Sequence, residues 1–309
     1  MRNQFAKTMC DLAQKNEEVI LLYGDIGNRL FDDFKKRFPN RFFNCGVAEA
    51  SMVGIAAGLA RSGYRPFVYT INSFLYLKAM EQIKIDVCYS SLPVTLVGTG
   101  SALSYSGLGS THHSLEDIGM LRTLPNLSIY APANGKELDR ALHSSLLASK
   151  PAYLRIGKKG EEEFPIEFNA KSQEVLPLLG LNKGKNSKLL VISTGTIATK
   201  VNRLISEMEI LRNSVTHSYV PQLAPPPIED LIRELQTHEK CLVIEEHNPI
   251  GALRSILAEI LVENSHIKTQ IFTINTRHAF HLGLGDLDEA RSVLGLSDFQ
   301  ISETLRKLC

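Results

Sequence analysis

The sequence predicts an α/β protein of two doubly wound domains, each built on a mostly parallel sheet. Three observations lead to this prediction. The chain has 309 residues, about twice the usual size of a domain. Short stretches rich in β-branched and aromatic residues alternate with longer stretches of helical periodicity, which is typical of βαβ units. One segment of mixed charge, rich in Gly, Asn and Pro, interrupts the alternation and predicts a connection between two domains.

The first expected domain covers residues 1–157. It begins with a helix, because Phe5, Met9 and Leu12 fall on one helical face. Strands and helices then alternate, so the strands are expected to lie parallel in one sheet. The expected strands are 18–24, 65–71, 92–98, 127–132 and 152–156, and the expected helices are 49–61, 74–88, 115–124 and 136–148.

The second expected domain covers residues 188–309, after a linker over 158–187. It repeats the alternation of apolar strands with amphipathic helices, which predicts a second parallel sheet. The expected strands are 188–194, 214–220, 240–246 and 268–274, and the expected helices are 197–211, 227–235 and 251–262.

The composition excludes several classes of protein. Lys and Arg number 34 against 33 Asp and Glu, which argues against a sequence-independent nucleic-acid binder. No apolar run approaches the roughly 20 residues that span a bilayer, and no signal peptide is evident at the amino terminus. The five cysteines are scattered without a CxxC pair. We therefore expect a cytoplasmic protein with no zinc site and no membrane or nucleic-acid partner.

In open α/β sheets, functional side chains follow the carboxyl ends of strands. Glu49 begins an expected helix and shares its apolar stripe with Met52, Val53 and Ala56. Burial on that stripe disfavours the charged carboxylate, whereas the helix amino terminus favours it. Two interpretations stay open. Glu49 is either an acid placed for the helix dipole or a functional group, with small residues over 54–58 allowing close approach of a ligand.

The next loop offers an aromatic side chain. Tyr76, Met80, Ile83 and Val87 form an apolar stripe at helical spacing, and such a stripe is most simply core. Phe74 lies off the stripe, at the junction of strand and helix, where it could stack on a flat ligand or simply pack.

The third loop, 98–117, is rich in Gly and Ser and ends in His112 and His113. Loops of this length inside an α/β unit are usually functional. Histidines can donate to anionic or hydroxylated ligands, and the two adjacent side chains diverge, so one can line a site while the other packs. No third metal ligand lies nearby at useful spacing, and Ser110 lacks the context of a nucleophile.

These segments, in this order, resemble the pyrimidine-binding and carboxy-terminal domains of the transketolase family. The resemblance covers almost the whole chain. Other enzymes that use thiamine diphosphate share the glutamate and the domain order, but the THH-x-x-ED-x-x-x-x-R-x-x-PN run is more similar to transketolase. The matching strings are NRFFNCGVAEASMVGIAAGLA, FVYTINSFL, GSTHHSLEDIGMLRTLPNLSIYAPAN and CLVIEEHNPIGAL.

The resemblance implies that the cofactor is thiamine diphosphate. Glu49 matches the glutamate that hydrogen-bonds N1′ of the aminopyrimidine, which starts the proton relay that activates the thiazolium C2. Phe74 matches an aromatic packed on the pyrimidine, and Asp25 matches an acid close to the cofactor. Tyr76, in the same segment as Phe74, is counted with these cofactor-binding residues.

The resemblance also implies the substrate-binding residues. His112 matches the histidine that contacts the donor sugar and the covalent intermediate, and His113 is placed beside it. Lys158 lies where the family has an arginine for the substrate phosphate, although lysine is a point charge rather than a fork. Leu108 stands where sugar-phosphate transketolases usually carry an acid, which leaves the substrate class open.

One family element is missing. The Gly-Asp-Gly segment that binds the diphosphate and its metal does not occur, and the chain begins almost directly at the pyrimidine-binding domain. We therefore expect an amino-terminal, diphosphate-binding transketolase subunit as partner, holding most of the Mg²⁺ (or Ca²⁺) site in a heterotetramer of two subunits of each kind.

The expected reaction transfers a two-carbon ketol unit from a ketose or ketose phosphate to an aldose. Two alternatives stay open: a β subunit of a 2-oxo-acid dehydrogenase decarboxylating component, and a non-catalytic assembly subunit of the same fold. The sequence does not identify the donor and acceptor sugars or the pathway.

Overall fold

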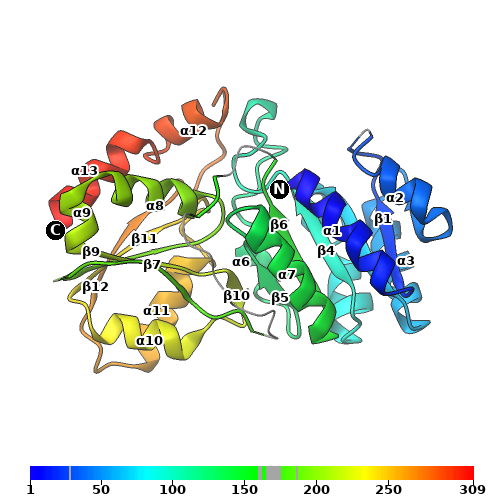
Figure 1. The fold of residues 1–309 in the computed structure, drawn as a ribbon, viewed down its shortest axis with the longest axis horizontal. Coiled ribbons are helices and arrows are strands. Elements are labelled where there is room, and N and C mark those ends of the chain that lie inside the picture. Colours follow the sequence, from blue (N-terminus) through cyan, green and yellow to red (C-terminus); the bar gives the residue numbers. More distant parts are fainter. Residues whose placement is uncertain (28, 159–161, 165–174, 186) are drawn as a thin grey trace.

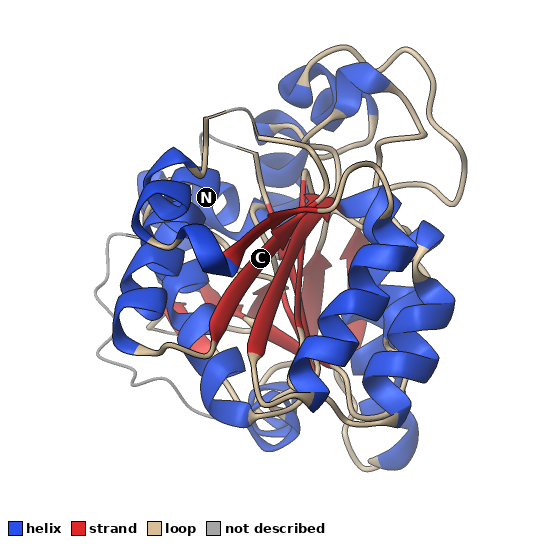
Figure 2. Cartoon of the chain, turned by 90° about the vertical axis from the view of Figure 1, so that its right-hand side faces the viewer, coloured by secondary structure: helices blue, strands red, loops and turns tan. Residues whose placement is uncertain are grey.

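Two mostly parallel sheets lie side by side in the molecule, each with helices packed against it (Figure 1). The computed structural model describes residues 1–309 except 28, 159–161, 165–174 and 186. The predicted fold class is confirmed, and the view in Figure 2 shows the strands in the centre with helices on either side. Within the described residues, none of the helices combines the length and the apolar character needed to cross a bilayer.

The first sheet has seven strands in the order β10-β5-β6-β4-β3-β1-β2. All neighbours are parallel except β10, which pairs antiparallel with β5 at one edge. The parallel strands therefore end at one common edge, where the loops that follow them meet. The strands are β1 Val19–Tyr23, β2 Phe42–Asn44, β3 Arg65–Ile71, β4 Thr95–Thr99, β5 Ser128–Tyr130, β6 Ala152–Ile156 and β10 Gln222–Ala224.

The helices around this sheet include those that the periodicity predicted, with three differences. Helix α2 was not expected, and the helix expected over 115–124 covers only Asp117–Leu121. The single helix expected over 74–88 is divided, because its second half winds as a π-helix, a form that proteins use mostly in single turns. The helices are α1 Arg2–Lys15, α2 Asp32–Arg37, α3 Glu49–Arg61, α4 Asn72–Lys78, α5 Met80–Gln82, α6 Asp117–Leu121, α7 Gly135–Ala148, the 3₁₀ turns η1 Pro39–Arg41 and η3 Ser106–Leu108, and the π-helix η2 Ile83–Tyr89.

The second sheet has five strands in the order β12-β11-β8-β9-β7, of which only β7 is antiparallel to its neighbour. Its strands are β7 Leu179–Lys183, β8 Leu189–Ser193, β9 Val215–Tyr219, β11 Lys240–Ile244 and β12 Gln270–Ile274, and its helices are α8 Ile197–Glu207, α9 Glu209–Ser214, α10 Ile228–Gln236, α11 Leu253–Glu263, α12 Leu287–Val293 and α13 Asp298–Leu308.

Three strands were not expected from the sequence. The first is the short strand β2, which pairs with β1. Strand β7 lies inside the segment 158–187, which was expected to be only a linker, and it pairs with β9. Strand β10 belongs to the second half of the chain but extends the first sheet. Residues 165–174 of the expected linker lie outside the described residues. All three are edge strands of three to five residues, and such short stretches give little periodic signal. The domain limits themselves stay a prediction.

The two halves of the chain share one hydrophobic core. A continuous cluster of buried residues includes Ile129 and Tyr153 of the first sheet together with Leu223 and Leu253 of the second half. The backbones also approach closely, because a Cβ atom on Gly119 would lie 2.8 Å from the carbonyl oxygen of Ile250. The relative position of the two sheets is therefore set by packing.

A buried polar cluster crosses this junction. Asp117 is completely buried and Arg155 is 5% exposed, and their Oδ2 and Nε atoms lie 3.0 Å apart. The Tyr153 hydroxyl donates to the same Asp117 oxygen at 2.6 Å, and the Asn72 amide donates to it at 2.9 Å. His247, from the second half, is also completely buried, with Nε2 3.8 Å from the Asp117 carboxylate.

Glu245, directly after β11, is a second buried carboxylate near this junction, and it stabilises the start of a helix. Its carboxylate accepts hydrogen bonds from the backbone N–H groups of Leu253 at 2.8 Å and Arg254 at 3.2 Å, at the start of α11. It therefore caps two of the N–H groups that a helix leaves unpaired at its amino terminus. Burial raises the pKa of Glu245 to about 7.

This raised pKa predicts a pH dependence of stability. Between about pH 4.5 and pH 7 the folded protein holds a proton on Glu245 that the unfolded chain releases. The free energy of unfolding should therefore fall by on the order of 3 kcal/mol as pH rises through this window. Urea unfolding of the unaltered chain and of Glu245→Gln, at pH values on either side of the window, measures the difference. Glu263→Gln, on the exposed end of α11, is the matched control.

The Glu245→Gln chain should lose this part of the slope, and Glu263→Gln should keep it. Equal slopes in Glu245→Gln and in the unaltered chain would contradict the assignment to Glu245. Burial lowers the pKa of His247 to about 4, so His247 contributes a slope of the opposite sign. This contribution is the same in the variant and in the unaltered chain, and it cancels when their free energies of unfolding are subtracted.

Candidate functional site

The residues singled out in the sequence come from loops at one edge of the first sheet. Asp25 follows β1, Glu49 follows β2, and Phe74 follows β3. His112 lies in the long loop after β4, and Lys158 follows β6. Because these strands are parallel and neighbouring, their carboxyl ends bring the five residues to the same edge.

Glu49 is the first residue of α3 and is 3% exposed. Met52, Val53 and Ala56 are also buried, as the predicted stripe requires. The hydroxyl of Thr70 donates to Glu49 Oε1 at 3.2 Å, and Nζ of Lys78 lies 3.3 Å from Oε2. The ammonium group offsets the loss of solvation that burial imposes on the carboxylate.

Lys78 connects Glu49 to the aromatic side chains of the site. Its Nζ lies 4.3 Å from the centroid of the Phe74 ring, within the range of a cation–π interaction. The ring of Phe74 is half-buried and meets the ring of His112 edge-on, with centroids 5.1 Å apart. Lys78 was not identified from the sequence, although its spacing of four residues from Phe74 places both on one helical face.

The contacts continue from His112 to Lys158. The rings of His112 and Tyr105 lie 6.3 Å apart, and Nζ of Lys158 lies 5.1 Å from the centroid of Tyr105. Tyr105 was also missed, and it is the only tyrosine or phenylalanine in the Gly- and Ser-rich loop. We call the continuous series Glu49, Lys78, Phe74, His112, Tyr105 and Lys158 the contact row.

Asp25 lies beside the contact row. Its side chain is exposed, and its backbone has a φ of 52°. Asn44 donates to Asp25 Oδ1 at 2.8 Å and accepts a hydrogen bond from the N–H of Gly46 at 2.9 Å. The described contacts of Asp25 therefore lead to the segment before Glu49. Its expected place close to the cofactor stays a prediction.

The assignment of Tyr76 to cofactor binding is corrected. Its side chain is 0% exposed within the hydrophobic core, as its apolar stripe predicted. Its hydroxyl donates to Glu116 Oε2 at 3.3 Å. The whole side chain is enclosed by core residues and offers no surface to a cofactor, so Tyr76 is a packing residue.

The two adjacent histidines diverge as expected. His112 joins the contact row, and its Nδ1 lies 3.0 Å from the hydroxyl of Thr111. His113 is 5% exposed, with Nε2 3.1 Å from the carbonyl oxygen of Ser106. His113 therefore has no part in the row, and its expected contact with the same substrate as His112 is not supported by its position.

The loop that carries His112 is held by the second half of the chain. The hydroxyl of Ser106 donates to the carbonyl oxygen of Gly285 at 3.0 Å, and that of Ser110 donates to the carbonyl oxygen of His281 at 2.6 Å. Ser110 is thus a structural residue, in agreement with its lack of a nucleophile context.

Lys158 borders a cleft of about 990 Å³ between the two halves of the chain. Three other cations line this cleft, and each is paired with a carboxylate: Lys200 and Arg203 with Asp298, both at 2.7 Å, and Arg291 with Glu246 at 2.7 Å. Among the described lining residues, Lys158 is the cation for which no carboxylate partner is found. This makes it the natural ligand of an anionic group.

Leu108 lies in the same cleft and is 57% exposed. Leu108 is the last residue of η3, close in sequence to Tyr105, and it lines the same cleft as Lys158.

Comparison with known proteins identifies a family for the first half of the chain and relatives for most of its length. Residues 1–160 match the family described as "Transketolase, pyrimidine binding domain". The chain is similar to one subunit of the apulose-4-phosphate transketolase of Phocaeicola vulgatus, with 29% identity over 98% of this chain and 95% of that protein. It is 34% identical to the protein of the same name from Actinobacillus succinogenes, over 75% of this chain and 73% of that one.

One solved structure is similar over its whole length. It is described as "Split gene transketolase, inactive beta4 tetramer", and it superimposes with a TM-score of 0.84 at 27% identity, over 99% of this chain and 96% of that chain.

The geometry of the contact row predicts that Lys78 stabilises the buried carboxylate of Glu49. Lys78→Met should lower the free energy of unfolding by about 1–2 kcal/mol, since a buried charge loses its counter-ion while the half-exposed lysine loses little. Urea unfolding measures the change. Lys84→Met, on the exposed face of η2, is the matched control and should stay within about 0.5 kcal/mol. Equal stabilities of the two variants would rule out this role of Lys78.

Proposed function

This chain belongs to the transketolase family, and we propose that it is the carboxy-terminal subunit of a split transketolase. It transfers a two-carbon ketol unit from a ketose or ketose phosphate to an aldose when a second subunit completes the site. The observation that carries this proposal is the contact row, which leads from a buried carboxylate, past an aromatic face and a histidine, to an unpaired lysine.

The site fits the pyrimidine end of thiamine diphosphate. Glu49 offers a buried carboxylate whose oxygens can accept a hydrogen bond from a ring nitrogen, and Phe74 offers a half-buried ring at the same place. When bound, the cofactor supplies a nucleophilic carbon that adds to the substrate carbonyl. This chain's part is to hold the proton at the carboxylate of Glu49 and to orient the aminopyrimidine against Phe74.

The diphosphate and the metal are assigned to the partner subunit. No group of three possible metal ligands is found among the described residues, and proteins of this family use a divalent metal with the cofactor. The relatives from P. vulgatus and A. succinogenes are themselves named as single subunits of a transketolase. These names support an amino-terminal subunit as partner, and we propose two subunits of each kind in the active assembly.

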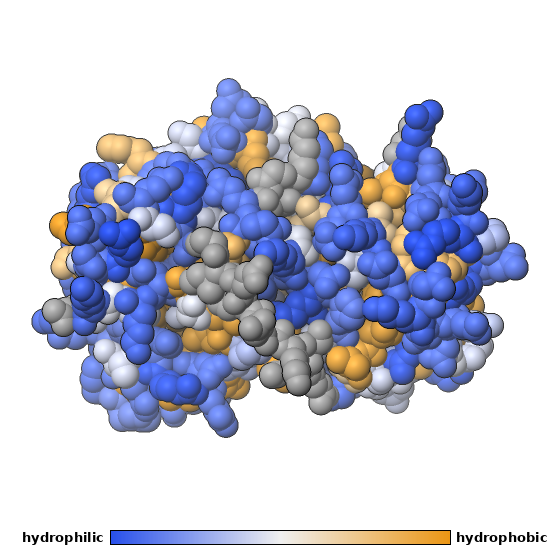
Figure 3. All heavy atoms as spheres, in the orientation of Figure 1, coloured by the Kyte–Doolittle hydropathy of each residue, from blue (hydrophilic) through white to orange (hydrophobic). Residues whose placement is uncertain are grey.

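The surface beside Glu49 supports the same arrangement. Much of the face drawn in Figure 3 is hydrophilic with scattered apolar patches. Four large apolar side chains on the segments around Glu49 are exposed, namely Phe43 at 44%, Val47 at 73%, Ile55 at 50% and Leu77 at 55%. Exposed apolar side chains on the segments beside a functional group are consistent with a surface that another chain covers.

The substrate is proposed to lie along the rest of the contact row. The imidazole of His112, half-buried beside Phe74, is placed to donate to a sugar hydroxyl or to hold a proton near the reacting carbonyl. Lys158 is placed to bind an anionic group at the far end, and phosphate is the anion that a sugar would carry. Leu108 adds apolar surface to the same cleft. Because sugar-phosphate transketolases usually carry an acid at this position, the class of the donor sugar stays open in this proposal.

Glu49→Gln tests the assignment most directly. With the partner subunit and thiamine diphosphate present, ketol transfer should fall by at least about 10²-fold, because an amide cannot take up the proton that the relay requires. The measurement is the steady-state rate of ketol transfer. Binding of thiamine diphosphate, followed by calorimetry, should persist with weaker affinity. Turnover of the variant near that of the unaltered protein would overturn the proposal, and decarboxylation of 2-oxo acids by the unaltered complex would favour the dehydrogenase alternative.

Lys158 should contribute to the binding of phosphorylated substrates and not to the binding of unphosphorylated ones. Lys158→Met should raise KM for a ketose phosphate by about 10-fold or more, which corresponds to the loss of about 1.4 kcal/mol, and leave KM for the unphosphorylated sugar unchanged. Lys158→Arg is the matched control, because it keeps the charge and should keep most of the affinity. If KM rises equally for both sugars, Lys158 does not bind the phosphate.

A further inference from the structure

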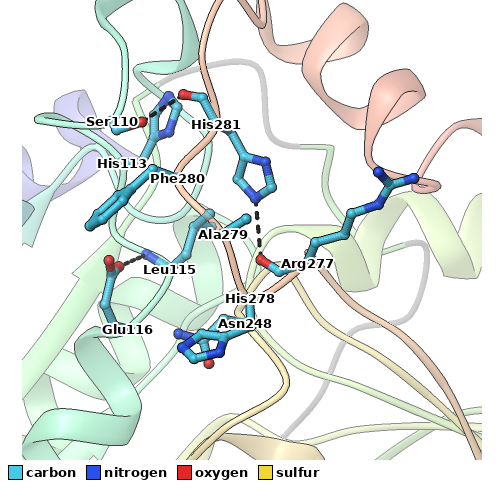
Figure 4. Close-up of a pocket in the computed structure, with 10 residues that line it drawn as sticks. All are labelled: Ser110, His113, Leu115, Glu116, Asn248, Arg277, His278, Ala279, Phe280 and His281. Carbon is cyan, nitrogen blue, oxygen red and sulfur yellow. Dashed lines mark hydrogen bonds between the residues drawn. The ribbon is translucent and has the colours of Figure 1, made fainter.

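A second cavity lies behind the loop that carries His112, apart from the contact row (Figure 4). Its volume is about 380 Å³, and its lining residues come from both halves of the chain. The first half supplies part of the segment 110–116, and the second half supplies Asn248 and the segment 277–281. None of the residues of the contact row lines this cavity. It is a separate site of ordinary ligand size.

His113 leaves an unpaired acceptor at this cavity. Its Nε2 lies 3.1 Å from the carbonyl oxygen of Ser106, and a carbonyl can only accept, so Nε2 carries the hydrogen. In the neutral ring Nδ1 is then a bare acceptor. The side chain is 5% exposed, and no described residue donates to Nδ1. The Nδ1 atom itself has almost no accessible surface, so a ligand reaches it only after a small displacement of the side chains around it. Because a buried acceptor without a donor is unfavourable, a ligand O–H or N–H that reaches Nδ1 in this way would be stabilised there.

The other polar groups of the cavity favour the same kind of ligand. Glu116 uses Oε2 for two hydrogen bonds, from the N–H of Leu115 at 2.6 Å and from the hydroxyl of Tyr76 at 3.3 Å. Neither bond occupies Oε1, which is a further acceptor. Asn248 uses its side-chain oxygen for the N–H of Ile250 at 2.8 Å, which leaves its amide N–H₂ group available to a ligand oxygen.

The charges of the cavity disfavour an anionic ligand. Figure 4 shows the guanidinium of Arg277 pointing away from the other lining residues, and Arg277 faces the cavity with its backbone, whose carbonyl oxygen is 3.3 Å from His281 Nε2. The carboxylate of Glu116 would repel a phosphate or carboxylate. The Phe280 side chain is 84% exposed and adds an aromatic surface beside Leu115.

We propose that this cavity binds a small uncharged polyol or sugar. Hydroxyl groups of such a ligand donate to His113 Nδ1 and to Glu116, accept from Asn248, and leave C–H surface for Phe280 and Leu115. The ligand ties the loop of His112 to the segment 277–281, which the bond from Ser110 to the carbonyl oxygen of His281, at 2.6 Å, already links. Binding here requires neither the cofactor nor ketol transfer, so it stands apart from the proposed function.

The test uses the full chain without the partner subunit or cofactor. The probes are ribitol, which is uncharged, and ribose 5-phosphate, which has a similar carbon chain and carries an anion. Isothermal titration measures the affinity, and ligand-observed saturation-transfer NMR reports which protons touch the protein. Ribitol should bind saturably at one site, and ribose 5-phosphate should not displace it.

Two variants locate the binding. His113→Gln keeps a side-chain N–H near the carbonyl oxygen of Ser106 but removes the acceptor at the Nδ1 position, and should weaken ribitol binding roughly 5–10-fold. Phe280→Ala alters an exposed residue, so the fold is retained, and should weaken binding about 3-fold or more. Glu49→Gln and Lys158→Met should bind ribitol like the unaltered chain.

Three results would overturn the proposal. The first is the absence of saturable ribitol binding. The second is that Phe280→Ala binds ribitol as tightly as the unaltered chain does, while His113→Gln either also binds it as tightly or fails to fold. The third is loss of binding in Lys158→Met, which would place the sugar in the cleft of the contact row. Loss of ketol transfer in Glu49→Gln has no bearing on these results, so this site and the proposed function can fail separately.

Discussion

The ion pair between Asp117 and Arg155 is the interaction on which the geometry of the site depends. Both groups are buried, and a buried charge is strongly unfavourable unless it is paired and hydrogen-bonded. That requirement draws in Tyr153 and Asn72 from the first sheet and its helix α4, and the Arg155 guanidinium also donates to the carbonyl oxygens of Ser114, at 3.1 Å, and Glu246, at 3.5 Å. One pair therefore connects the end of β6, the start of α4, the loop after β4 and the end of β11.

These connections explain why the loop of His112 can be long and still be ordered. Asn72 donates to the hydroxyl of Ser114 at 2.8 Å, and this hydroxyl accepts from the N–H of Ala102 at 3.1 Å, so the base of the loop is closed. Its tip is held from the other side by the bonds of Ser106 and Ser110 to the second half of the chain. The second sheet supplies none of the contact row, but it fixes the loop on which His112 depends. Preorganisation of this kind determines whether a catalytic group lies in a productive position.

The two cavities on either side of this loop differ in their chemistry. In the larger cleft the carboxylates neutralise every described lining cation except Lys158, so an anionic group has one defined place to bind. In the smaller cavity the lining offers both acceptors and donors, and the guanidinium of Arg277 points away from the other lining residues. The same loop thus contributes both to the proposed anion site and to the proposed sugar site. Charge pairing, rather than composition, decides which groups remain available to a ligand.

Local sequence patterns were enough to predict the alternation of strands and helices, and with it the parallel sheets and the edge at which Glu49, Phe74 and His112 meet. Asp25 and Lys158 were added only by the resemblance to a family. The local patterns also predicted the burial of Glu49, because helical periodicity records which face a residue occupies. Tertiary packing was needed to show that Lys78 and Tyr105 complete the row, that Tyr76 is core, that His113 borders another cavity, and that β7 and β10 join the sheets. Periodicity encodes which side chains are buried, whereas these contacts join residues far apart in sequence, such as Ser106 and Gly285. They depend on how the two sheets pack, and no periodicity of either segment records that packing.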